Sequence, residues 1–384
     1  MNDAYRRLET QLVHAGEPTP RFAGAVEMPI FQSATYEYAG EGSYHDVRYL
    51  RTNNTPSQLA LHAKLAALEG AEAALVTASG MAAISTTLLS VLAPGDHLLA
   101  QRCLYGGTHD LVTHELARLG IEHDFIDADR RDSWRELLRP NTRAIYVEAL
   151  TNPLLEVADL EGVVQFARAH RLLSLIDNTF ATPVNFRPLS AGFDLVLHSA
   201  TKYLNGHADI VAGAVAGSAA LIERIRQRAN HLGGSLDPHA AFLLKRGLKT
   251  LALRVRYQND SAQQLAQFLS EQRAVARVYY AGLASHPRHE RARRLFAGFG
   301  GVLSFELHGP PERAEEFARR VRIAIVAPSL GGVHTLLTRP ATTSHAGLTR
   351  AERLELGIGD GLLRLSVGIE STEDLIEDLR QALA

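Results

Sequence analysis

Apolar and polar residues follow two different periods along the middle of the chain. Short apolar runs predict strands at residues 73–77, 97–101, 122–126, 143–148, 172–177, 193–198 and 210–216. Between them, apolar positions recur about every three to four residues and predict helices at 57–68, 81–92, 111–119, 133–138 and 160–170. Strands that alternate with helices are typical of a mainly parallel sheet covered on both faces. In such α/β sheets, ligands bind at the carboxyl ends of the strands.

The pattern changes near residue 238. The remaining periodicity predicts one long helix over 240–270, strands at 301–307 and 363–367, and helices at 311–322 and from Thr372 onwards. Ser371 is expected to cap the last helix, because acidic residues follow it in the first turn. The first 53 residues show no strong periodicity, and we expect an arm that lies across the body of the protein or across a neighbouring subunit. The chain therefore divides into an arm (1–53), a large α/β domain (54–245) and a smaller α+β domain (246–384).

Composition narrows the classes of protein that remain. The 384 residues carry a formal net charge of −2, which gives no indication of binding to nucleic acid or to an anionic membrane. No stretch is apolar enough for a membrane span, and the start of the chain lacks the apolar run of a signal peptide. Cys103 is the only cysteine, so an internal disulfide and a cysteine cluster for zinc are excluded. We expect a cytoplasmic protein from a reducing compartment.

The strand predicted at 193–198 is followed by two hydroxyl side chains and a lysine. Lys202 is one of only four lysines in the chain, and it lies close to Ser199 and Thr201. A lysine amine can be deprotonated and become a nucleophile, whereas arginine cannot take that role. A single lysine at the end of an apolar strand, flanked by hydroxyls, suggests a Schiff base to an aldehyde cofactor that carries a phosphate.

Two further strand ends could meet Lys202 at the same edge of the sheet. Asp177 closes a predicted strand. Alone it is better explained as a turn or helix-cap residue, but beside Lys202 it could hold the protonated ring nitrogen of pyridoxal phosphate (PLP). Gly80 and Met81 stand between a strand and a helix, where free N–H groups suit a phosphate. Small residues are common at such turns, so this pattern indicates a phosphate site only together with the others.

Two tyrosines and two arginines are further candidates for binding the cofactor or the substrate. Tyr105 follows a predicted strand, where it could stack on a flat ring and take part in acid/base steps, or pack at the edge of the core. Arg364 lies within an apolar strand and needs a partner, either a substrate carboxylate or an internal salt bridge. Tyr49 and Arg51 lie in the arm, where a solvated surface pair is the simpler interpretation. The histidines show no spacing typical of metal ligands, and we expect no metal.

Motifs distributed over nearly the whole chain resemble those of the PLP-dependent enzymes of cysteine and methionine metabolism. This family includes cystathionine γ-synthase, cystathionine γ-lyase, cystathionine β-lyase and methionine γ-lyase. The matching stretches are Val13 to Gly16, Tyr49 to Arg51, Ser79 to Met81, Tyr105 to Thr108, Thr151 to Leu154, Asp177 to Phe180, Ser199 to Tyr203, Gly206-His207, Ser329 to Gly332, Pro340 to Thr342 with His345, and Arg364 to Gly368. The resemblance implies an α/β PLP-dependent transferase fold of the aspartate aminotransferase type (fold type I), in which residues 54–245 form the PLP-binding domain.

The resemblance also implies roles for individual residues in binding the cofactor. Lys202 would bind the aldehyde, Asp177 would pair with the ring nitrogen, and Tyr105 would stack on the ring. The residues implied to hold the phosphate are Gly80, Met81, Ser199 and Thr201.

Substrate and subunit contacts follow from the same resemblance. The carboxylate of a small amino-acid substrate would be bound by Arg364 with Asn152 and Ser329. Tyr49 and Arg51 would reach the phosphate of a neighbouring subunit. This arrangement implies a homotetramer built of two catalytic dimers.

The chain departs from the family pattern at four places. Pro328 precedes Ser329, where bacterial synthases and γ-lyases often have a glutamate, and this puts recognition of the distal amino group of cystathionine in doubt. Gly107 stands where methionine γ-lyases typically carry a cysteine. The other two departures are Asn54-Thr55-Pro56 in place of Asn-Pro-Thr, and Glu148-Ala149-Leu150-Thr151-Asn152-Pro153 in place of Glu-Ser-Pro-Thr-Asn-Pro.

The leading functional hypothesis is chemistry at the γ-carbon of a homoserine- or cysteine-derived amino acid. This would be γ-replacement or γ-elimination, as in cystathionine γ-synthase or γ-lyase, and the sequence does not separate the two. The alternative is a C–S lyase of the methionine γ-lyase or cystathionine β-lyase type. An aminotransferase shares the fold but is disfavoured by the motif set. A non-enzymatic protein is disfavoured because Lys202, Asp177, Tyr105 and Arg364 are all present.

Overall fold

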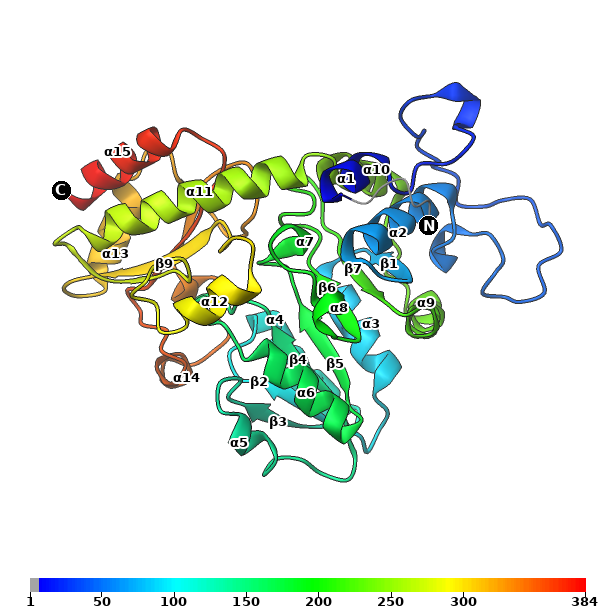
Figure 1. Cartoon of the computed structure of the whole chain (residues 1–384), viewed down its shortest axis with the longest axis horizontal. Coiled ribbons are helices and arrows are strands. Elements are labelled where there is room, and N and C mark those ends of the chain that lie inside the picture. Colours follow the sequence, from blue (N-terminus) through cyan, green and yellow to red (C-terminus); the bar gives the residue numbers. More distant parts are fainter. Residues whose placement is uncertain (1–6) are drawn as a thin grey trace.

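A seven-stranded sheet forms the centre of the larger part of the molecule (Figure 1). This computed structural model describes residues 7–384. The strand order is β1-β7-β6-β5-β4-β2-β3, and the strands from β6 to β3 pair in parallel. The exception is β7, which runs antiparallel to both of its neighbours, β1 and β6. The strands are β1 (Ala73–Thr77), β2 (His97–Gln101), β3 (Glu122–Ile126), β4 (Thr142–Glu148), β5 (Leu173–Asp177), β6 (Leu195–His198) and β7 (Gly213–Gly217).

Helices cover both faces of this sheet, as the sequence predicts. In β4, Ile145 and Val147 belong to a core shared with α2 and α6, whereas Ala144 and Tyr146 belong to a core shared with α3 and α9. This division follows from the two-residue period of a strand. The helices of this part are α2 (Pro56–Glu69), α3 (Gly80–Val91), α4 (Gly106–Asp110), η3 (Leu111–Leu116), α5 (Arg131–Trp134), α6 (Leu160–His170), α7 (Thr182–Asn185), α8 (Pro188–Ala191), α9 (Ala219–Leu232) and α10 (Pro238–Leu248).

A second sheet of five strands forms the smaller C-terminal domain. Its order is β10-β11-β12-β9-β8, and every pair except β10–β11 is antiparallel. The strands are β8 (Val275–Tyr279), β9 (Val302–Leu307), β10 (Ile325–Val326), β11 (Leu336–Thr338) and β12 (Leu363–Ser366). The helices are α11 (Leu251–Ser270), α12 (His289–Leu295), α13 (Glu312–Arg320), η4 (Pro340–Thr342), α14 (Arg350–Glu355) and α15 (Thr372–Leu383). The predicted cap of α15 is confirmed, because the side chain of Ser371 accepts the N–H of Asp374.

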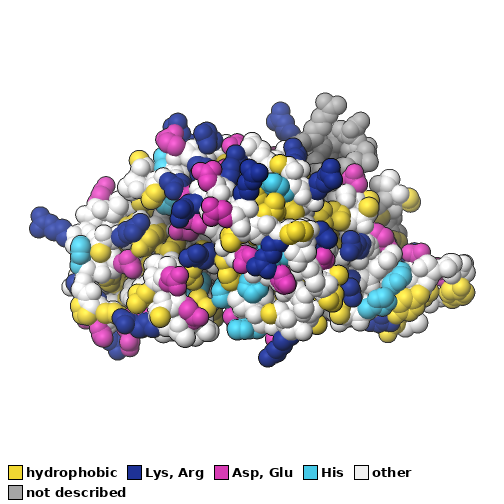
Figure 2. Space-filling view, turned by 90° about the horizontal axis from the view of Figure 1, so that it is seen from below, with side chains coloured by type: hydrophobic (Ala, Val, Ile, Leu, Met, Phe, Trp, Pro, Cys, Tyr) yellow, Lys and Arg dark blue, Asp and Glu magenta, His cyan; other side chains and the backbone are white. Residues whose placement is uncertain are grey.

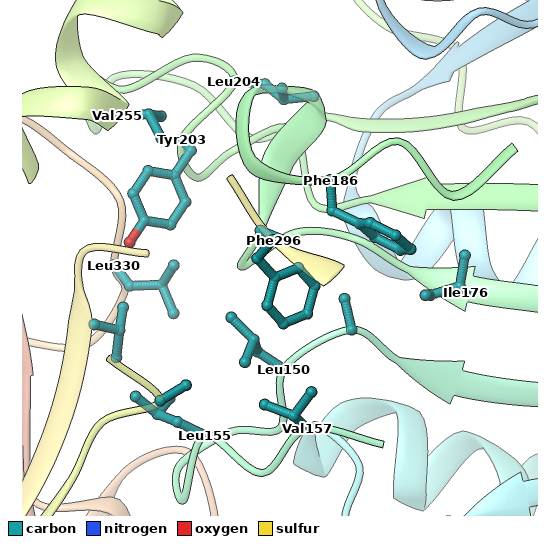
Figure 3. Packing of buried hydrophobic residues seen from close by; sticks show 14 of the residues in the cluster. Leu150, Leu155, Val157, Ile176, Phe186, Tyr203, Leu204, Val255, Phe296 and Leu330 are labelled. Carbon is teal, nitrogen blue, oxygen red and sulfur yellow. The ribbon is translucent and has the colours of Figure 1, made fainter. Parts of the chain in front are cut away.

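One apolar core runs from the large sheet into the C-terminal domain. Figure 3 shows Leu150 from the large part and Phe296 from the C-terminal part within this cluster. Tyr203 belongs to the same core and is 1% exposed, directly after Lys202 in the chain. The hydroxyl of Tyr203 accepts a hydrogen bond from the backbone N–H of Gly301 (3.1 Å). The core therefore fixes the turn that carries Lys202.

The single helix predicted over residues 240–270 is wrong, because the chain forms two helices there, α10 and α11. The guanidinium of Arg254 donates to the carbonyl of Gly247 near the end of α10 and to the carbonyl of Tyr203, each at 2.8 Å. One bond satisfies a carbonyl near the break, and the other ties the break to the turn that carries Lys202. Apolar periodicity could not reveal the break, since its cause is a contact between segments far apart in sequence.

Other differences concern short elements. The helix predicted at 111–119 is the π-helical segment η3, which continues α4, and the helix predicted at 133–138 is the shorter α5. The sequence patterns did not predict α9, β8, α12, β11 or α14. In β8, most side chains are exposed or only part-buried, so no regular alternation marks it.

The N-terminal arm lies across α2 and α10. Its helix α1 (Leu8–His14) ends over Lys64 of α2, whose Nζ donates to the carbonyl of Leu12 (2.8 Å). Lys245 of α10 forms ion pairs with Glu17 (2.8 Å) and Glu27 (3.1 Å) of the arm. Further along, the segment that leads to η2 (Leu50–Thr52) extends away from the body (Figure 1). The arm is thus bound to the body by lysines, and the domain boundaries at 53 and 245 stay predictions.

The surface carries charges of both signs. Figure 2 shows Lys and Arg interspersed with Asp and Glu over the face that it displays. Within residues 7–384, no helix combines the length and the apolar character needed to cross a membrane.

Candidate active site

The carboxyl ends of four neighbouring strands meet at one edge of the large sheet. β2 ends on Gln101, β4 on Glu148 and β5 on Asp177, and the turn after β6 carries Lys202. Glu148 pairs with Asp177 across β4 and β5, and Asp177 pairs with Leu197 across β5 and β6. The structure therefore brings the two residues singled out first, Asp177 and Lys202, to the edge where parallel sheets bind ligands.

Lys202 is part-buried, and its amine is held by a hydroxyl. Lys202 Nζ donates to Ser329 Oγ (2.7 Å). Burial lowers the pKa of Lys202 to about 8, and the positive charge of Arg364 acts in the same direction. A substantial fraction of the amine is therefore neutral near physiological pH, which a nucleophile or a general base requires.

Asp177 presents a half-buried carboxylate at the sheet edge. Its Oδ1 accepts the backbone N–H of Thr179 (2.9 Å). Burial raises the pKa of Asp177 above its usual value, and the hydrogen bonds from Thr179 and the nearby His198 offset only part of that rise. Thr179 had not been assigned a role from the sequence, although its Oγ1 also accepts the N–H of Ser199 (2.8 Å). This threonine therefore links Asp177 to the turn that precedes Lys202.

The start of α3 lies tightly against the turn after β6. A Cβ on Gly80 would lie 2.8 Å from the Cβ of Ser199, so only glycine permits this approach. Ser79 caps α3 by accepting a backbone N–H of the first turn (3.0 Å), and the preceding N–H groups, of Gly80 and Met81, have no partner inside the helix. Gly213 was missed from the sequence, yet a Cβ there would lie 2.0 Å from the carbonyl oxygen of Ser79. Three closely packed backbones thus form a cradle for an anion.

Thr201 has a different environment from Ser199. Its hydroxyl donates to the carbonyl of Ala212 (3.1 Å) and accepts the N–H of the same residue (3.0 Å). The hydroxyl hydrogen of Thr201 is thus already used in joining the turn to the segment before β7. To donate to a phosphate, Thr201 would have to exchange that bond.

Tyr105 stands at the mouth of the same edge and is 42% exposed, which argues against a core-edge role. Its ring lies beside Gly107, because a Cβ there would be 2.8 Å from a ring carbon and 3.2 Å from the sulfur of Met81. The backbone N–H of Tyr105 donates to Glu148 Oε1 (2.6 Å). No role was predicted for Glu148 beyond its place in a motif, although a carboxyl that ends an apolar strand is the same signal that marks Asp177.

Arg364, Asn152 and Ser329 form one group although they are far apart in sequence. Arg364 donates to Asn152 Oδ1 and to the carbonyl of Ser329, both at 2.8 Å. Arg364 is 3% exposed, and burial lowers its pKa to about 10. Within residues 7–384 it has no carboxylate partner, and its Nε has no hydrogen-bond partner. Arg364 therefore forms no internal salt bridge in this part of the chain. The carboxylate of a ligand is the natural partner for its guanidinium.

Tyr49 and Arg51 lie apart from this group. Arg51 donates to the carbonyl of Asn230 in α9 (2.7 Å), and its guanidinium lies over the rings of Tyr49 (5.5 Å) and Tyr44 (5.7 Å). The described chain shows no hydrogen bond between either residue and Lys202.

Comparison with known proteins assigns the family. Residues 9–384 match the family described as Cys/Met metabolism PLP-dependent enzyme. The chain belongs to this family. It is 44% identical over 376 residues to the cystathionine gamma-lyase of Bacillus subtilis (strain 168), with 98% of both chains covered. It is 42% identical over 377 residues to the cystathionine beta-lyase of Lactococcus lactis subsp. cremoris (strain MG1363), and 40% identical over 386 residues to the L-methionine gamma-lyase of Fusobacterium nucleatum subsp. polymorphum, each with 98% of both chains covered.

Solved structures of related proteins agree with the fold. A cystathionine gamma-lyase from Lactobacillus plantarum complexed with L-serine superposes with a TM-score of 0.93 at 38% identity, covering 98% of each chain. The metB protein of Corynebacterium glutamicum superposes with a TM-score of 0.94 at 34% identity, covering 100% of this chain and 99% of that one. The predicted fold type I, with a large, mainly parallel sheet and a smaller C-terminal domain, is confirmed.

The sheet edge fits the cofactor of the Cys/Met metabolism PLP-dependent enzymes. The glycine-lined approach of α3 to Ser199 suits a phosphate, the carboxylate of Asp177 suits a cationic ring nitrogen, and Lys202 supplies an amine of lowered pKa. The predicted cofactor, PLP, is confirmed by the family.

Proposed function

We propose that this chain is a trans-sulfuration enzyme that acts at the γ-carbon of a homoserine- or cysteine-derived amino acid, by γ-elimination or γ-replacement. The observation that carries the proposal is the bridge made by Ser329, whose hydroxyl binds Lys202 Nζ (2.7 Å) and whose carbonyl binds Arg364 (2.8 Å). An amino acid whose carboxylate binds Arg364 would hold its Cα close to the lysine amine. The 44% identity to a cystathionine gamma-lyase supports this reaction class.

The residues proposed to hold the cofactor surround the same point. Lys202 binds the aldehyde, Asp177 pairs with the ring nitrogen and Tyr105 stacks on the ring. The phosphate contacts are the N–H groups of α3 and the hydroxyls of the following turn, contributed by Gly80, Met81, Ser199 and Thr201. When bound, PLP supplies an electron sink for the carbon atoms of the amino acid.

Lys202 and Tyr105 would carry out the proton transfers. The Nζ of Lys202, with a pKa of about 8, accepts a proton from the Cα of an amino acid held at Arg364. The same nitrogen moves protons at Cβ, which loss of a γ-substituent requires. The hydroxyl of Tyr105 would donate a proton to the leaving group, and its 42% exposure at the mouth of the site supports this role. Asn152 keeps the guanidinium of Arg364 in place through its 2.8 Å hydrogen bond.

β-Elimination of cystathionine is the second candidate, because a cystathionine beta-lyase from Lactococcus lactis is 42% identical over nearly the whole chain. Pro328, which is exposed and uncharged next to Ser329, offers no charge to a distal ammonium group. Recognition of the distal ammonium group of cystathionine would therefore have to come from residues other than Pro328. Gly107 stands where methionine γ-lyases typically carry a cysteine, and this argues against methionine as the substrate.

A product panel tests the reaction type. The protein is incubated with cystathionine, with methionine, and with an O-acylated homoserine plus cysteine. γ-Elimination of cystathionine consumes water and yields cysteine, 2-oxobutyrate and ammonia, whereas β-elimination yields homocysteine, pyruvate and ammonia. New cystathionine indicates γ-replacement. If the protein only exchanges amino groups with a keto acid, the proposal is wrong.

A spectroscopic test addresses the role of Lys202. The wild-type protein is expected to show a visible absorption band that disappears in Lys202→Ala. A colourless wild-type protein supplied with PLP would contradict the assignment of the site.

We further propose a homotetramer of two catalytic dimers, in which Tyr49 and Arg51 reach the phosphate of a neighbouring subunit. Arg51 binds the carbonyl of Asn230 in α9 and none of the residues grouped around Lys202, which supports this proposal. Leu253 of α11, an apolar side chain that is 71% exposed, also supports a subunit contact. Light scattering tests the tetramer. Co-assembly of Arg51→Ala with Lys202→Ala chains tests the exchange, because one intact site per mixed pair would recover activity. The buried Cys103 supports a cytoplasmic location.

A further inference from the structure

Glu148 has a central place at the sheet edge, and none of the roles above uses it. It ends β4, which lies between β5 and β2 in the sheet. Because it pairs with Asp177 across the parallel strands, both side chains project to the same face. On the other side, its backbone N–H donates to Gln101 Oε1 at the end of β2 (2.9 Å). The backbone of Glu148 is therefore held from both neighbouring strands.

The side chain of Glu148 holds the turn that carries Tyr105. Glu148 Oε1 accepts the backbone N–H of Tyr105 at 2.6 Å, across 43 residues of sequence. Directly after Tyr105, a Cβ on Gly106 would lie 2.4 Å from the carbonyl oxygen of Ser344, so the turn has little room to move. The N–H of Tyr105 is fixed by Glu148, and the carbonyl of Ser344 packs against the next residue. The backbone that carries the exposed ring of Tyr105 therefore has a defined position.

Two carboxyl groups at this spacing cannot both be charged without a large cost. Glu148 is 4% exposed, and burial together with the Asp177 carboxylate raises the pKa of Glu148 well above its usual range. Among the residues that the structure describes, Tyr146 on the same strand and Cys103 near the end of β2 also interact with Glu148, and neither brings a positive charge. Hydrogen bonds from Tyr105 and Asn152 lower the pKa of Glu148, as those from Thr179 lower the pKa of Asp177. The effect of burial is larger at Glu148, because Asp177 is only half-buried. The proton of the pair therefore belongs on Glu148.

We propose that Glu148 is a positioning residue of this active site: as an uncharged acid, it fixes the Tyr105 turn and leaves the negative charge of the sheet edge on Asp177. The inference rests on the roles proposed above for Tyr105 and Asp177. A charged Glu148 would add a second negative charge beside Asp177 and compete with it for the cationic ring nitrogen. An apolar residue would release the turn.

Glu148→Ala and Glu148→Gln separate these two functions. Alanine removes the acceptor of the Tyr105 N–H, and we expect the dissociation constant of PLP from the apo-protein to rise by about tenfold, the effect of one lost buried hydrogen bond. Glutamine places a carbonyl oxygen at the position of Oε1 and an uncharged amide at the position of the acid hydroxyl. It is therefore expected to restore PLP affinity to within about twofold of the wild type, since hydrogen bond and charge are both retained. The pH midpoint of the visible absorption band should also match the wild type.

Each outcome decides one part of the inference. An alanine variant that binds PLP like the wild type would show that Glu148 does not position Tyr105. Two results with the glutamine variant would show that Glu148 is charged. One is PLP binding as weak as that of the alanine variant. The other is a fall of about one pH unit in the midpoint of the visible band, because the loss of a nearby negative charge lowers the pKa of a protonated group.

Controls keep the test independent of folding and of the proposed function. If the alanine variant does not fold, Glu148→Asp replaces it, since its carboxyl is one methylene too short to reach Tyr105. Glu122→Ala removes an exposed carboxylate paired with Arg139 at the opposite end of the strands, and should leave PLP affinity unchanged. A wild-type protein that fails to bind PLP would refute the proposed function, whereas a normal wild type with an unaffected alanine variant would refute only the role of Glu148.

Discussion

The hydroxyl of Ser329 should set the pH at which the apo-protein captures its cofactor. Ser329 Oγ lies 2.7 Å from Lys202 Nζ, whose pKa is lowered to about 8 by burial and by Arg364. Only the neutral amine attacks an aldehyde, so the rate of PLP capture should rise with pH through a midpoint of about 8. Replacing Ser329 by alanine removes the hydroxyl but leaves the carbonyl that binds Arg364.

The size of the shift follows from the two states of the amine. A hydrogen bond from a charged ammonium contributes about 1.5–3 kcal/mol, and one between the neutral amine and the hydroxyl contributes about 0.5–1.5 kcal/mol. The difference, about 1.4 kcal/mol, corresponds to about one pKa unit. Because the charged form loses more, the midpoint for Ser329→Ala should fall by about one unit, and capture at acidic pH should become faster.

Stopped-flow measurement of the visible absorption after mixing apo-protein with PLP, repeated across pH, gives this midpoint directly. Ser329 also has a positive φ of 88°, which is strained for any side chain. Ser329→Gly loses the same hydroxyl and relieves that strain. The two variants should therefore share one midpoint, with glycine about 1 kcal/mol more stable than alanine. A midpoint for Ser329→Ala that stays within about 0.2 units of the wild type, or that rises, would refute the reasoning.

Three further predictions concern the charge, the shape and the acid stability of the protein. Asp177→Asn should reduce kcat by about 10²–10³-fold with folding unchanged, because the site loses its preorganised charge; a steady-state assay that finds a loss below tenfold contradicts this. Gly80→Ala places a Cβ 2.8 Å from that of Ser199, so PLP titration should show about tenfold weaker binding or more, and wild-type affinity would show that the backbones can separate. Burial lowers the pKa of His62 to about 3, so below about pH 6.5 the unfolded chain binds a proton that the folded protein does not. The free energy of unfolding should therefore be highest above about pH 6.5 and fall by about 1.4 kcal/mol per pH unit below it. Thermal melts of His62→Gln between pH 4 and 7 should show a smaller slope than the wild type, and an equal slope assigns the loss to other groups.

Regular elements of the large sheet were predictable because each lies within a single periodic segment. The strands at 73–77, 97–101 and 122–126 and the helix at 160–170 coincide with β1, β2, β3 and α6. The antiparallel direction of β7 was not predictable, since the direction of a strand depends on its connection and not on its apolar period. At the break between α10 and α11, Arg254 binds the carbonyl of Tyr203, 51 residues away, and no local pattern records this contact.

The residues of the site also differ in whether a local sequence pattern could identify them. Asp177 and Lys202 were found because a charge at the end of an apolar strand is unusual within a short window of sequence. The grouping of Arg364 with Asn152, 212 residues apart, followed only from the family resemblance. The bond between Lys202 and Ser329, which spans 127 residues, was not predicted at all. Gly213 looked like an ordinary glycine of a strand, because its constraint comes from the carbonyl of Ser79.

The antiparallel strand β7 also determines how early during synthesis and folding the chain can bind its cofactor. β1 finds its partner only when β7 is available, as the pairing of Ala73 with Gly217 shows. Contacts between segments so distant in sequence form late, because the entropy of closing a long loop must be offset first. On the ribosome, β7 cannot pair with β1 until Gly217 has emerged. Until then, the backbone that packs beside Gly80 is missing from the phosphate cradle. Pyridoxal phosphate would therefore select chains whose sheet is complete, and its binding would then stabilise those chains against reopening by mass action.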